Sequence, residues 1–593
     1  MTRFTRRGRS RWIAVGALAA AGALVLAGCG GGGGDNNFGS TTAPQAKGRQ
    51  GNVYVSPQVP SGPGVTVAAD TAYTAYNNDT AANNTVYNLY ASLPVLASAT
   101  VLDNDGTPLI NGDMMAGIDE VSTNPQVIRW RMKPGVTWSD GAPWNCKDFY
   151  LAYLAGSGKI PGFTAASSNG YGNIGQAQCL DDTTFQATFA QPFADYIGLF
   201  SQNNGDLLPA HILEQKTGIP DIRQITPASP PAQLQAMTQF WNTGWNGFDK
   251  SVMPASAQYQ LDSWVQDQSV TMTRNPAWKG NPGGPERLTY RNIADATAAA
   301  QALQNNEIQV TANQPDVNAS NLLRSLSAQG VKFQATSGAS YEHLDMNFKN
   351  PLFADKAVRT AFAQCVPRQD ITDKLVKGVQ PDAAPLQSLM FLPSQRGYED
   401  AYSQLIGTGN PQQASQTLTQ DGWVKGPDGV FAKNGQPLQF RISHTNVPRR
   451  VQTVQLIQAA CQQAGIKIVD DNDPNFLDTR LGAGDYDVAL YAWQNDPFTS
   501  SHESIYKTGG SQNYQGYSNP QLDALMAQAS GNLDPAGYLA QWQQADKLMA
   551  QDLPSIPLYV QPNTVGYTDK IDNVWYQPNL GAMLHANEWA VTQ

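Results

Sequence analysis

The first 29 residues determine where the rest of this chain folds. Five arginines within residues 3–11 precede an apolar run, residues 12–28, which ends in small residues before Cys29. A basic segment, a short apolar run and a small-residue cut site are typical of a secretion signal. The apolar run is shorter than the about 20 residues that a membrane-spanning helix needs. We therefore expect residues 1–28 to be a signal peptide and the remaining chain to fold outside the cytoplasm.

The end of this run, Leu26-Ala27-Gly28-Cys29, resembles the bacterial lipobox. The resemblance implies cleavage before Cys29 and acylation of its thiol; an ordinary signal peptide or an uncleaved anchor is the alternative. Residues 29–64 begin with a stretch rich in Gly, Ser, Asn and Pro that has little apolar content, so we expect them to form a flexible tether. The sequence has no other run that approaches a membrane span in length. It thus predicts a soluble body that meets the membrane only through a lipid anchor.

The net charge of the chain bears on which partners it can bind, and its length bears on how many lobes it forms. The chain has 593 residues and a net charge of −10, and the predicted leader carries five arginines and no acid, so its removal brings the charge to −15. A surface that acidic argues against nucleic acid or anionic lipid as the partner. The length is too great for one ordinary domain and predicts two or three lobes. Frequent Pro and Gly, with only 15% charged residues, favour mixed α and β structure with many loops.

Four cysteines remain besides Cys29: Cys146, Cys179, Cys365 and Cys461. Disulfides are allowed outside the cytoplasm, and four cysteines permit three pairings. Cys365 and Cys461 each share a helical face with apolar residues, so both point into a core. They form either a bridge between two helices or two buried free thiols. Our preferred pairing is 146–179 and 365–461.

The sequence patterns of catalysis and of metal or cofactor binding are missing or out of context. None of the five histidines stands at metal-ligand spacing to another His or Cys, and the chain has neither a Gly-x-Ser-x-Gly elbow nor a Walker A loop. One Gly-x-Gly-x-x-Gly pattern, residues 170–175, follows a loop instead of a strand and is interpreted as a surface loop. We therefore expect no enzyme activity, no metal and no cofactor.

A series of short motifs carries a family resemblance. An alternating strand leads into Trp138-Ser139-Asp140-Gly141-Ala142-Pro143 and then into a helix, with Asp140-Gly141 as a strong turn dipeptide. Further segments follow in order: LLPAHILEQ (207–215), YQLDSWVQDQSVTMTRNPAWKG (259–280), LDMNFKNPLFADKAVRTAFAQCVPRQDI (344–371), GDYDVALYAW (484–493) and IPLYVQPN (556–563). Together they resemble the dipeptide/oligopeptide-binding family of extracellular solute-binding proteins, family 5, which serve ABC importers. The resemblance covers about residues 70 to 590.

Three positions depart from the family pattern. A Gly-Thr-Gly-Pro-Tyr turn of the family is PASAQY here (254–259), its Gly-Glu-x-Asp is residues 306–309, Asn-Glu-Ile-Gln, and its Asp-Arg is Pro367-Arg368. These departures indicate a divergent branch, and they bear on the ligand more than on the fold.

The resemblance implies an α/β fold of two lobes, like that of periplasmic binding proteins of type II (cluster C), with an extra subdomain in the first lobe. The expected boundaries are residues 65–338 for lobe I, including the extra subdomain at about 85–205; 339–559 for lobe II; and 560–593 for the return to lobe I. Two crossing strands near residues 340–347 and 556–563 would form the hinge. The ligand would lie between lobes that close over it.

The stretch from Asp485 to Phe498 carries the predicted ligand site. An extended peptide can add to an exposed strand edge, and Tyr491 to Gln494 is our candidate for that edge. In peptide-binding members an Asp three residues after the aromatic of this strand holds the ligand ammonium, and the spacing of Trp493 and Asp496 matches. The alternative is that Asp496 only turns the chain before Pro497. Trp493 either walls a side-chain pocket or belongs to the core.

Further site candidates come from their position in the expected fold. They are Asn495 beside the acid, Tyr341, Glu342 and His343 at the hinge, and Asn513 and Tyr514 in a loop. A partner for a ligand carboxylate is not located by any motif, and Arg441, Arg449 and Arg450 are candidates by location alone.

These features predict a monomeric, lipid-anchored binding protein that captures oligopeptides and delivers them to the permease subunits of an ABC importer. An oligosaccharide is the alternative ligand, because 13 tryptophans would suit stacking on sugar rings. Nickel and haem are less favoured, since histidines are few. A secreted hydrolase of the cell envelope is the alternative from a different class. It is disfavoured because no pair of nucleophile and base can be named.

Overall fold

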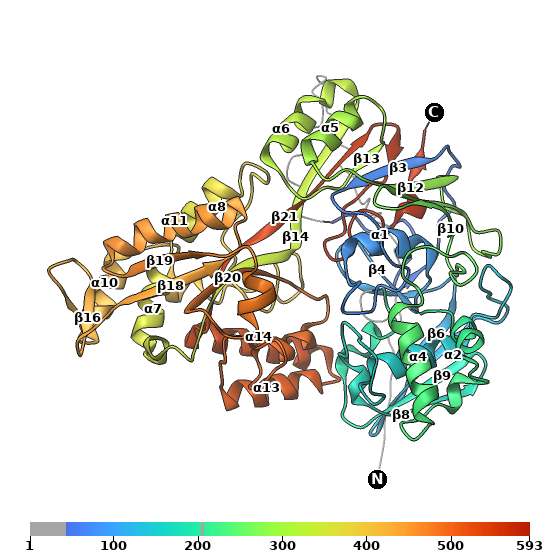
Figure 1. The fold of residues 1–593 in the computed structure, drawn as a ribbon, viewed down its shortest axis with the longest axis horizontal. Helices are drawn as coiled ribbons and strands as arrows, with labels where there is room; N and C mark the ends of the chain where they lie inside the picture. Colours follow the sequence, from blue (N-terminus) through green and yellow to red (C-terminus); the bar gives the residue numbers. More distant parts are fainter. Residues whose placement is uncertain (1–42, 203–206, 593) are drawn as a thin grey trace, which may run out of the picture. The chain divides into compact units, whose positions relative to one another are not determined.

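The computed structural model describes residues 43–202 and 207–592, and its largest element is a mixed sheet of ten strands (Figure 1). The predicted signal peptide, Cys29 and the beginning of the predicted tether lie outside the described residues. In spatial order the strands are β10 (Tyr259–Val265), β11 (Ser269–Arg274), β12 (Arg287–Asn292), β3 (Val65–Ala69), β13 (Val310–Thr311), β21 (Ser555–Thr568), β14 (Val331–Met346), β20 (Val488–Gln494), β18 (Gln439–His444) and β19 (Lys467–Asn472).

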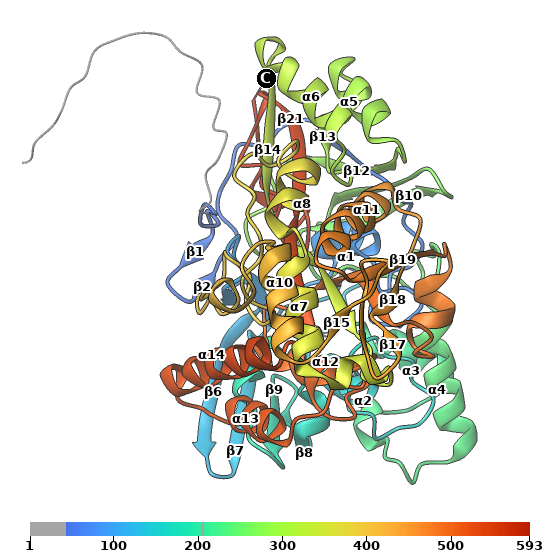
Figure 2. The same cartoon turned by 90° about the vertical axis from the view of Figure 1, so that its left-hand side faces the viewer.

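The two longest strands, β14 and β21, lie side by side in the middle of this sheet (Figures 1 and 2). They pair antiparallel from Val331 opposite Thr568 to Asp345 opposite Ser555, and the register shifts between Ser337 and Tyr341. One end of the ladder borders β13, and the other end borders β20. The same two strands therefore connect two hydrophobic cores, and they contain the segments that we predict to form the hinge.

The first core packs around strands β3 and β10 to β13. It includes two further four-stranded sheets, in the orders β1-β2-β5-β4 and β6-β7-β9-β8. Their strands are β1 (Arg49–Gln50), β2 (Val53–Tyr54), β4 (Thr100–Leu102), β5 (Pro108–Asn111), β6 (Met115–Thr123), β7 (Gln126–Met132), β8 (Ile174–Asp181) and β9 (Thr184–Phe189). Its helices are α1 (Val86–Val95), α2 (Cys146–Gly156), α3 (Ala210–Thr217) and α4 (Pro231–Thr243). Helices α5 (Ala296–Gln304) and α6 (Val317–Ser325) pack in a separate small cluster with Ala68 of β3 and Val331 of β14.

The second core takes its residues from Ala339 to Val560, and its strand residues include Leu344 on β14, Leu490 on β20 and Ile442 on β18. Its helices are α7 (Lys356–Cys365), α8 (Arg368–Leu375), α9 (Ser403–Ile406), α10 (Pro411–Gln420), α11 (Pro448–Gln463), α12 (Glu503–Tyr506), α13 (Pro520–Ser530) and α14 (Pro535–Asp552). A small sheet of β15 (Val424–Lys425), β16 (Phe431–Lys433) and β17 (Gln436–Pro437) lies between α10 and β18 in the sequence. Strands β22 (Ile571–Asp572) and β23 (Ala590–Val591) pair after the chain has returned to the first core.

Both predicted disulfides are formed, one in each core. Cys146 at the start of α2 is bonded to Cys179 on β8, and Cys365 at the end of α7 is bonded to Cys461 on α11. The helix start at Cys146 follows from local sequence, because Asn145 and the acid three residues later form a capping box. The bridge between α7 and α11 joins two helices of the second core, and buried free thiols are excluded for this pair.

Residues 43–64, which we predicted to be tether, are folded in the structure, so this part of the prediction is wrong. Strands β1 and β2 form a hairpin, and β2 continues into a parallel pairing with β5. Tyr54 and Ala46 are buried in the first core, and the backbone amides of Lys47 and Gly48 donate to Glu588. Sparse apolar content misled the prediction, because backbone pairing and a few buried side chains hold this segment.

Candidate ligand-binding site

Strand β20 has an unpaired edge along its second half. On one side β14 pairs with it over its whole length, from Met346 opposite Val488 to Ser340 opposite Gln494. On the other side β18 pairs with it only at Val488 and Ala489. From Leu490 to Gln494 the described chain supplies no strand on that side. The unused backbone donors and acceptors of such an edge can pair with an extended peptide.

An aromatic surface lies at the end of the same strand. The half-buried ring of Trp493 stacks on the half-buried ring of Tyr514 at 5.9 Å, with an interplanar angle of 11°. The Tyr491 ring meets Trp493 edge-on at 5.3 Å. The indole nitrogen of Trp493 has no hydrogen-bond partner within the described part of the chain. Trp493 and Tyr514 are thus placed together, and both retain partly exposed surface.

The last residues of β20 are tied to a segment that has returned to the first core. The exposed Gln494 side chain donates to the Asn579 carbonyl at 3.3 Å, and the Asn579 amide group donates to the Asn495 carbonyl at 2.7 Å. The Asn495 backbone amide donates to Ala339 on β14 at 2.8 Å, and its side chain is buried. Gln494 and Asn495 therefore lie where the two cores meet.

Asp496 follows directly and shapes the turn after the strand. Its Oδ1 accepts a hydrogen bond from the Phe498 amide at 2.8 Å, which is the Asx-turn geometry of a turn-forming aspartate. The carboxylate is half-buried. A carboxylate has about four acceptor positions, so a role in the turn is compatible with a contact to a ligand cation. The ammonium clamp stays a prediction.

The three hinge candidates are buried, so their side chains present almost no surface to a ligand in this structure. Tyr341, Glu342 and His343 are each at most 1% exposed. The Tyr341 hydroxyl lies 3.2 Å from that of Tyr506, and Glu342 forms an ion pair with Arg450 at 3.2 Å. The physical reason is the position of β14, which has neighbouring strands on both sides and core residues on both faces.

The Tyr491 side chain is also turned inward, so only its backbone belongs to the candidate edge. Its hydroxyl donates to the fully buried Asp345 at 2.6 Å, and His343 Nε2 lies 3.3 Å from the same oxygen. Burial acts to raise the pKa of Asp345, but the charge interaction with the nearby His343 and the hydrogen bonds from Ser555 and Tyr491 outweigh it and hold the pKa below its usual value. This network stabilises the junction of β14, β20 and β21.

Two other groups of candidates are engaged within the protein. Asn513 donates to the carbonyls of Lys507 and Tyr517, at 2.8 Å each, and so organises its own loop. Among the arginines considered for a ligand carboxylate, Arg450 is paired with Glu342 as described above. Arg441 lies within 3.5 Å of three aspartates, namely Asp471, Asp485 and Asp487. Neither arginine carries a free positive charge for a ligand.

A pocket of about 700 Å³, a volume that includes open solvent at its mouth, lies next to this site, and sequence reasoning missed the residues that form it. Four segments supply its lining: residues 105–107, 391–396, 497–499 and 577–579. They come from both cores, and Pro497 directly follows the predicted clamp Asp496. The segments are far apart in sequence and carry no motif, so only the fold brings them together.

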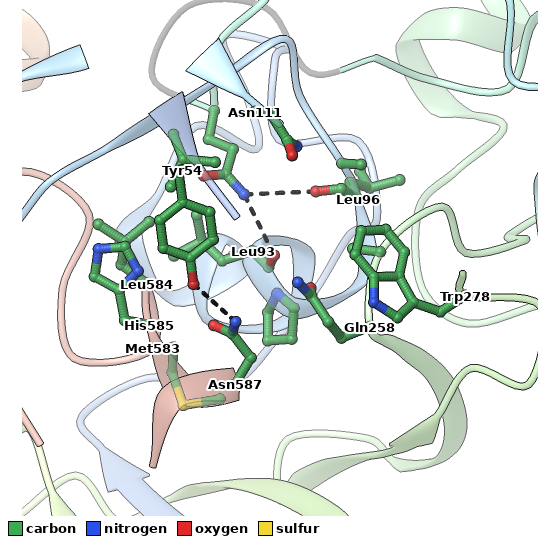
Figure 3. A pocket seen from close by; sticks show the side chains of 15 residues that line it. Tyr54, Leu93, Leu96, Asn111, Gln258, Trp278, Met583, Leu584, His585 and Asn587 are labelled. Atoms are coloured by element: carbon green, nitrogen blue, oxygen red, sulfur yellow. Dashed lines mark hydrogen bonds between the residues drawn. The ribbon is translucent and has the colours of Figure 1, made fainter. Parts of the chain in front are cut away.

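A second pocket, of about 450 Å³ including open solvent, is lined by first-core residues (Figure 3). Its walls are held by internal bonds: the Gln202 side chain donates to the carbonyls of Leu93 and Leu96, and Asn587 donates to the Tyr54 hydroxyl at 2.8 Å (Figure 3). None of its lining residues comes from β20 or from the turn at Asp496. It is therefore separate from the candidate ligand site.

The two cores also touch through Asp195, which no sequence pattern singled out. Its Oδ2 accepts hydrogen bonds from the Tyr538 hydroxyl at 2.8 Å and from the Ser500 amide at 3.1 Å. Burial raises the pKa of this carboxyl. The Phe498 ring packs so closely on Gly198 that a Cβ atom there would lie 2.5 Å from the ring. The segment after β20 is thus held against the first core.

None of the helices described is long and apolar enough to cross a membrane. Within residues 43–202 and 207–592, no three His, Cys, Asp or Glu side chains gather in a way that could hold a metal ion.

Comparison with known proteins places the chain in a family. Residues 93–516 match the sequence model of a family, the bacterial extracellular solute-binding proteins, family 5. The chain belongs to this family. The oligopeptide-binding protein OppA of Mycobacterium tuberculosis is 28% identical over 484 residues, which cover 81% of this chain and 76% of OppA. Members of this family are substrate-binding proteins of ABC importers and not enzymes.

Solved structures of the family share the fold. The periplasmic EDTA-binding protein EppA superposes with a TM-score of 0.80 at 24% identity, covering 92% of this chain and all of EppA. The oligopeptide-binding protein AppA from Bacillus subtilis, in complex with a nonapeptide, gives a TM-score of 0.70 at 18% identity, covering 90% of this chain and all of AppA. The predicted fold class, the two-lobed α/β fold of periplasmic binding proteins, is confirmed.

Proposed function

We propose that this family-5 protein captures oligopeptides at the end of β20 and delivers them to the permease subunits of an ABC importer. The observation that carries the proposal is the unpaired edge from Leu490 to Gln494, followed directly by the carboxylate of Asp496. A peptide added to this edge would satisfy its main-chain groups whatever its side chains are. Its ammonium would lie at the end of the strand, where Asp496 can neutralise it.

Two further observations support the proposal. The partly exposed rings of Trp493 and Tyr514 offer an apolar wall for one ligand side chain. Among relatives, OppA of Mycobacterium tuberculosis is named an oligopeptide-binding protein, and the AppA structure holds a nonapeptide. The protein works as a monomer outside the cell membrane, held by a lipid on Cys29, as the lipobox-like sequence implies.

An oligosaccharide is the second candidate ligand, because the flat pair of Trp493 and Tyr514 would also suit a sugar ring. Isothermal titration calorimetry of the purified protein separates the two. We expect free-acid oligopeptides to bind with a dissociation constant in the micromolar range or tighter, about −8 kcal/mol, and maltooligosaccharides to give no heat of binding. Saturable binding of the sugars, with no heat from any peptide, would overturn the proposal.

A further inference from the structure

We propose that the cavity beside Pro497 is a specificity pocket for an acidic side chain at the amino end of the ligand, recognised by Arg396 and Gln577. This inference rests on the proposed function, because it places the ammonium of a peptide at Asp496. Pro497 lines this cavity, so the first ligand side chain would have its space within reach. The pocket chemistry then determines which side chain it favours.

Arg396 supplies a positive charge that the protein does not use. It lines the cavity and is exposed. It forms no hydrogen bond or ion pair with any other residue of the described chain. Arg450 and Arg441, by contrast, are neutralised by their own carboxylates. A planar guanidinium is well suited to a carboxylate, which it can bind through two parallel hydrogen bonds.

Gln577 supplies a buried donor without an acceptor. Its side chain is 1% exposed and lines the same cavity. Its Oε1 accepts hydrogen bonds from the backbone amides of Asn579 at 2.8 Å and Leu580 at 2.7 Å, which fixes the orientation of the amide group. Its Nε2 is left without a partner in the described structure. A buried donor of this kind gains free energy when an acceptor arrives.

The remaining lining groups are compatible with an acidic side chain. Phe391 and Leu392 line the cavity as well and would contact its methylene groups. Asp105 is the one carboxylate among the lining residues. Its Oδ1 accepts from the Thr107 amide at 2.8 Å, and its Oδ2 lies 3.8 Å from the Arg49 guanidinium. Arg49 also pairs with the buried Asp103, so it offsets the charge of Asp105 only in part. Arg396 is the one cation among the residues that line the pocket.

The test compares two peptides, Glu-Ala-Ala-Ala and Gln-Ala-Ala-Ala, which differ only in the charge of the first side chain. By isothermal titration calorimetry we expect the wild type to bind the Glu peptide about tenfold more tightly, as for one charge-assisted hydrogen-bonded contact. Arg396→Gln should abolish this preference by weakening the Glu peptide alone. Gln577→Glu keeps the oxygen that binds the two backbone amides, and should weaken the Glu peptide by repulsion.

Arg287→Gln is the matched control, because Arg287 is an exposed arginine that does not line the cavity. The Arg287→Gln variant should prefer the Glu peptide over the Gln peptide as strongly as the wild type does. If the wild type binds both peptides equally tightly, or if Arg396→Gln still prefers the Glu peptide, the proposed specificity for an acidic side chain is wrong. The proposed function would remain intact in either case.

If neither peptide binds, the proposed function fails, and glutarate becomes the probe. Binding of glutarate that Arg396→Gln abolishes supports the anion pocket, and no binding of glutarate overturns it.

Discussion

Asp496→Asn is expected to weaken the binding of free-amino oligopeptides about 50-fold, or about 2.3 kcal/mol. The substitution keeps the side-chain oxygen that accepts from the Phe498 amide, so the turn is preserved. It removes the negative charge that would balance the ligand ammonium. An unpaired charge in an enclosed site costs several kcal/mol, of which only part is recovered by water or by a weaker neutral hydrogen bond. Isothermal titration calorimetry with one tetrapeptide measures the change.

Two comparisons make this result specific. Asp428 is an exposed aspartate that caps a turn in the same way, through a hydrogen bond from the Val430 amide at 3.1 Å. Asp428→Asn should leave peptide affinity unchanged. An N-acetylated peptide lacks the ammonium and should bind wild type and Asp496→Asn equally weakly. If Asp496→Asn binds the free-amino peptide as tightly as wild type, Asp496 serves only the turn.

Removal of the bridge between α7 and α11 is expected to lower the free energy of unfolding by about 4.7 kcal/mol. The pair Cys365→Ala and Cys461→Ala opens a loop of 96 residues, and a longer loop gains more conformational entropy in the unfolded chain. Both sulfurs are fully buried in the second core, so Ala avoids placing a new polar group there. Equilibrium guanidinium unfolding, followed by circular dichroism, measures the loss.

The other disulfide provides the internal comparison. Cys146 and Cys179 are 33 residues apart, so the pair Cys146→Ala and Cys179→Ala should cost less, about 3.7 kcal/mol. Equal unfolding midpoints of the Cys365/Cys461 variant and the wild type would contradict the account. A larger loss at Cys146 and Cys179 would show that packing around each bridge outweighs loop length.

Sequence reasoning succeeded where a pattern depends on neighbours in the chain. The motif around Asp140 and Gly141 and the order of the later motifs led to the correct family. The helical faces of Cys365 and Cys461 pointed to the correct bridge. Burial of Trp138 accords with its place in a strand-and-turn motif of the first core. In each case, residues close in the sequence carry the information that identifies the element.

Sequence reasoning failed where the outcome depends on what covers a segment. Tyr341 and Glu342 were named as site candidates only from their position at the hinge that the family resemblance implies. The fold places strands on both sides of them and an arginine, Arg450, beside the acid. Arg396 and Gln577 were overlooked because neither belongs to a motif, and their segments meet only in the folded chain. The sequence thus predicted the part of the candidate site that lies along β20, and it missed the residues that line the neighbouring cavity.

Native mass spectrometry of the protein purified from its own cells tests the central claim most directly. The account predicts that the folded protein carries a series of bound oligopeptides, which are released on denaturation and identified by tandem mass spectrometry. The pocket at Arg396 further predicts that acidic residues are enriched at their amino ends. A bound mass that corresponds to a sugar or to a metal chelate, with no peptide, would contradict the assignment of oligopeptides as the ligand.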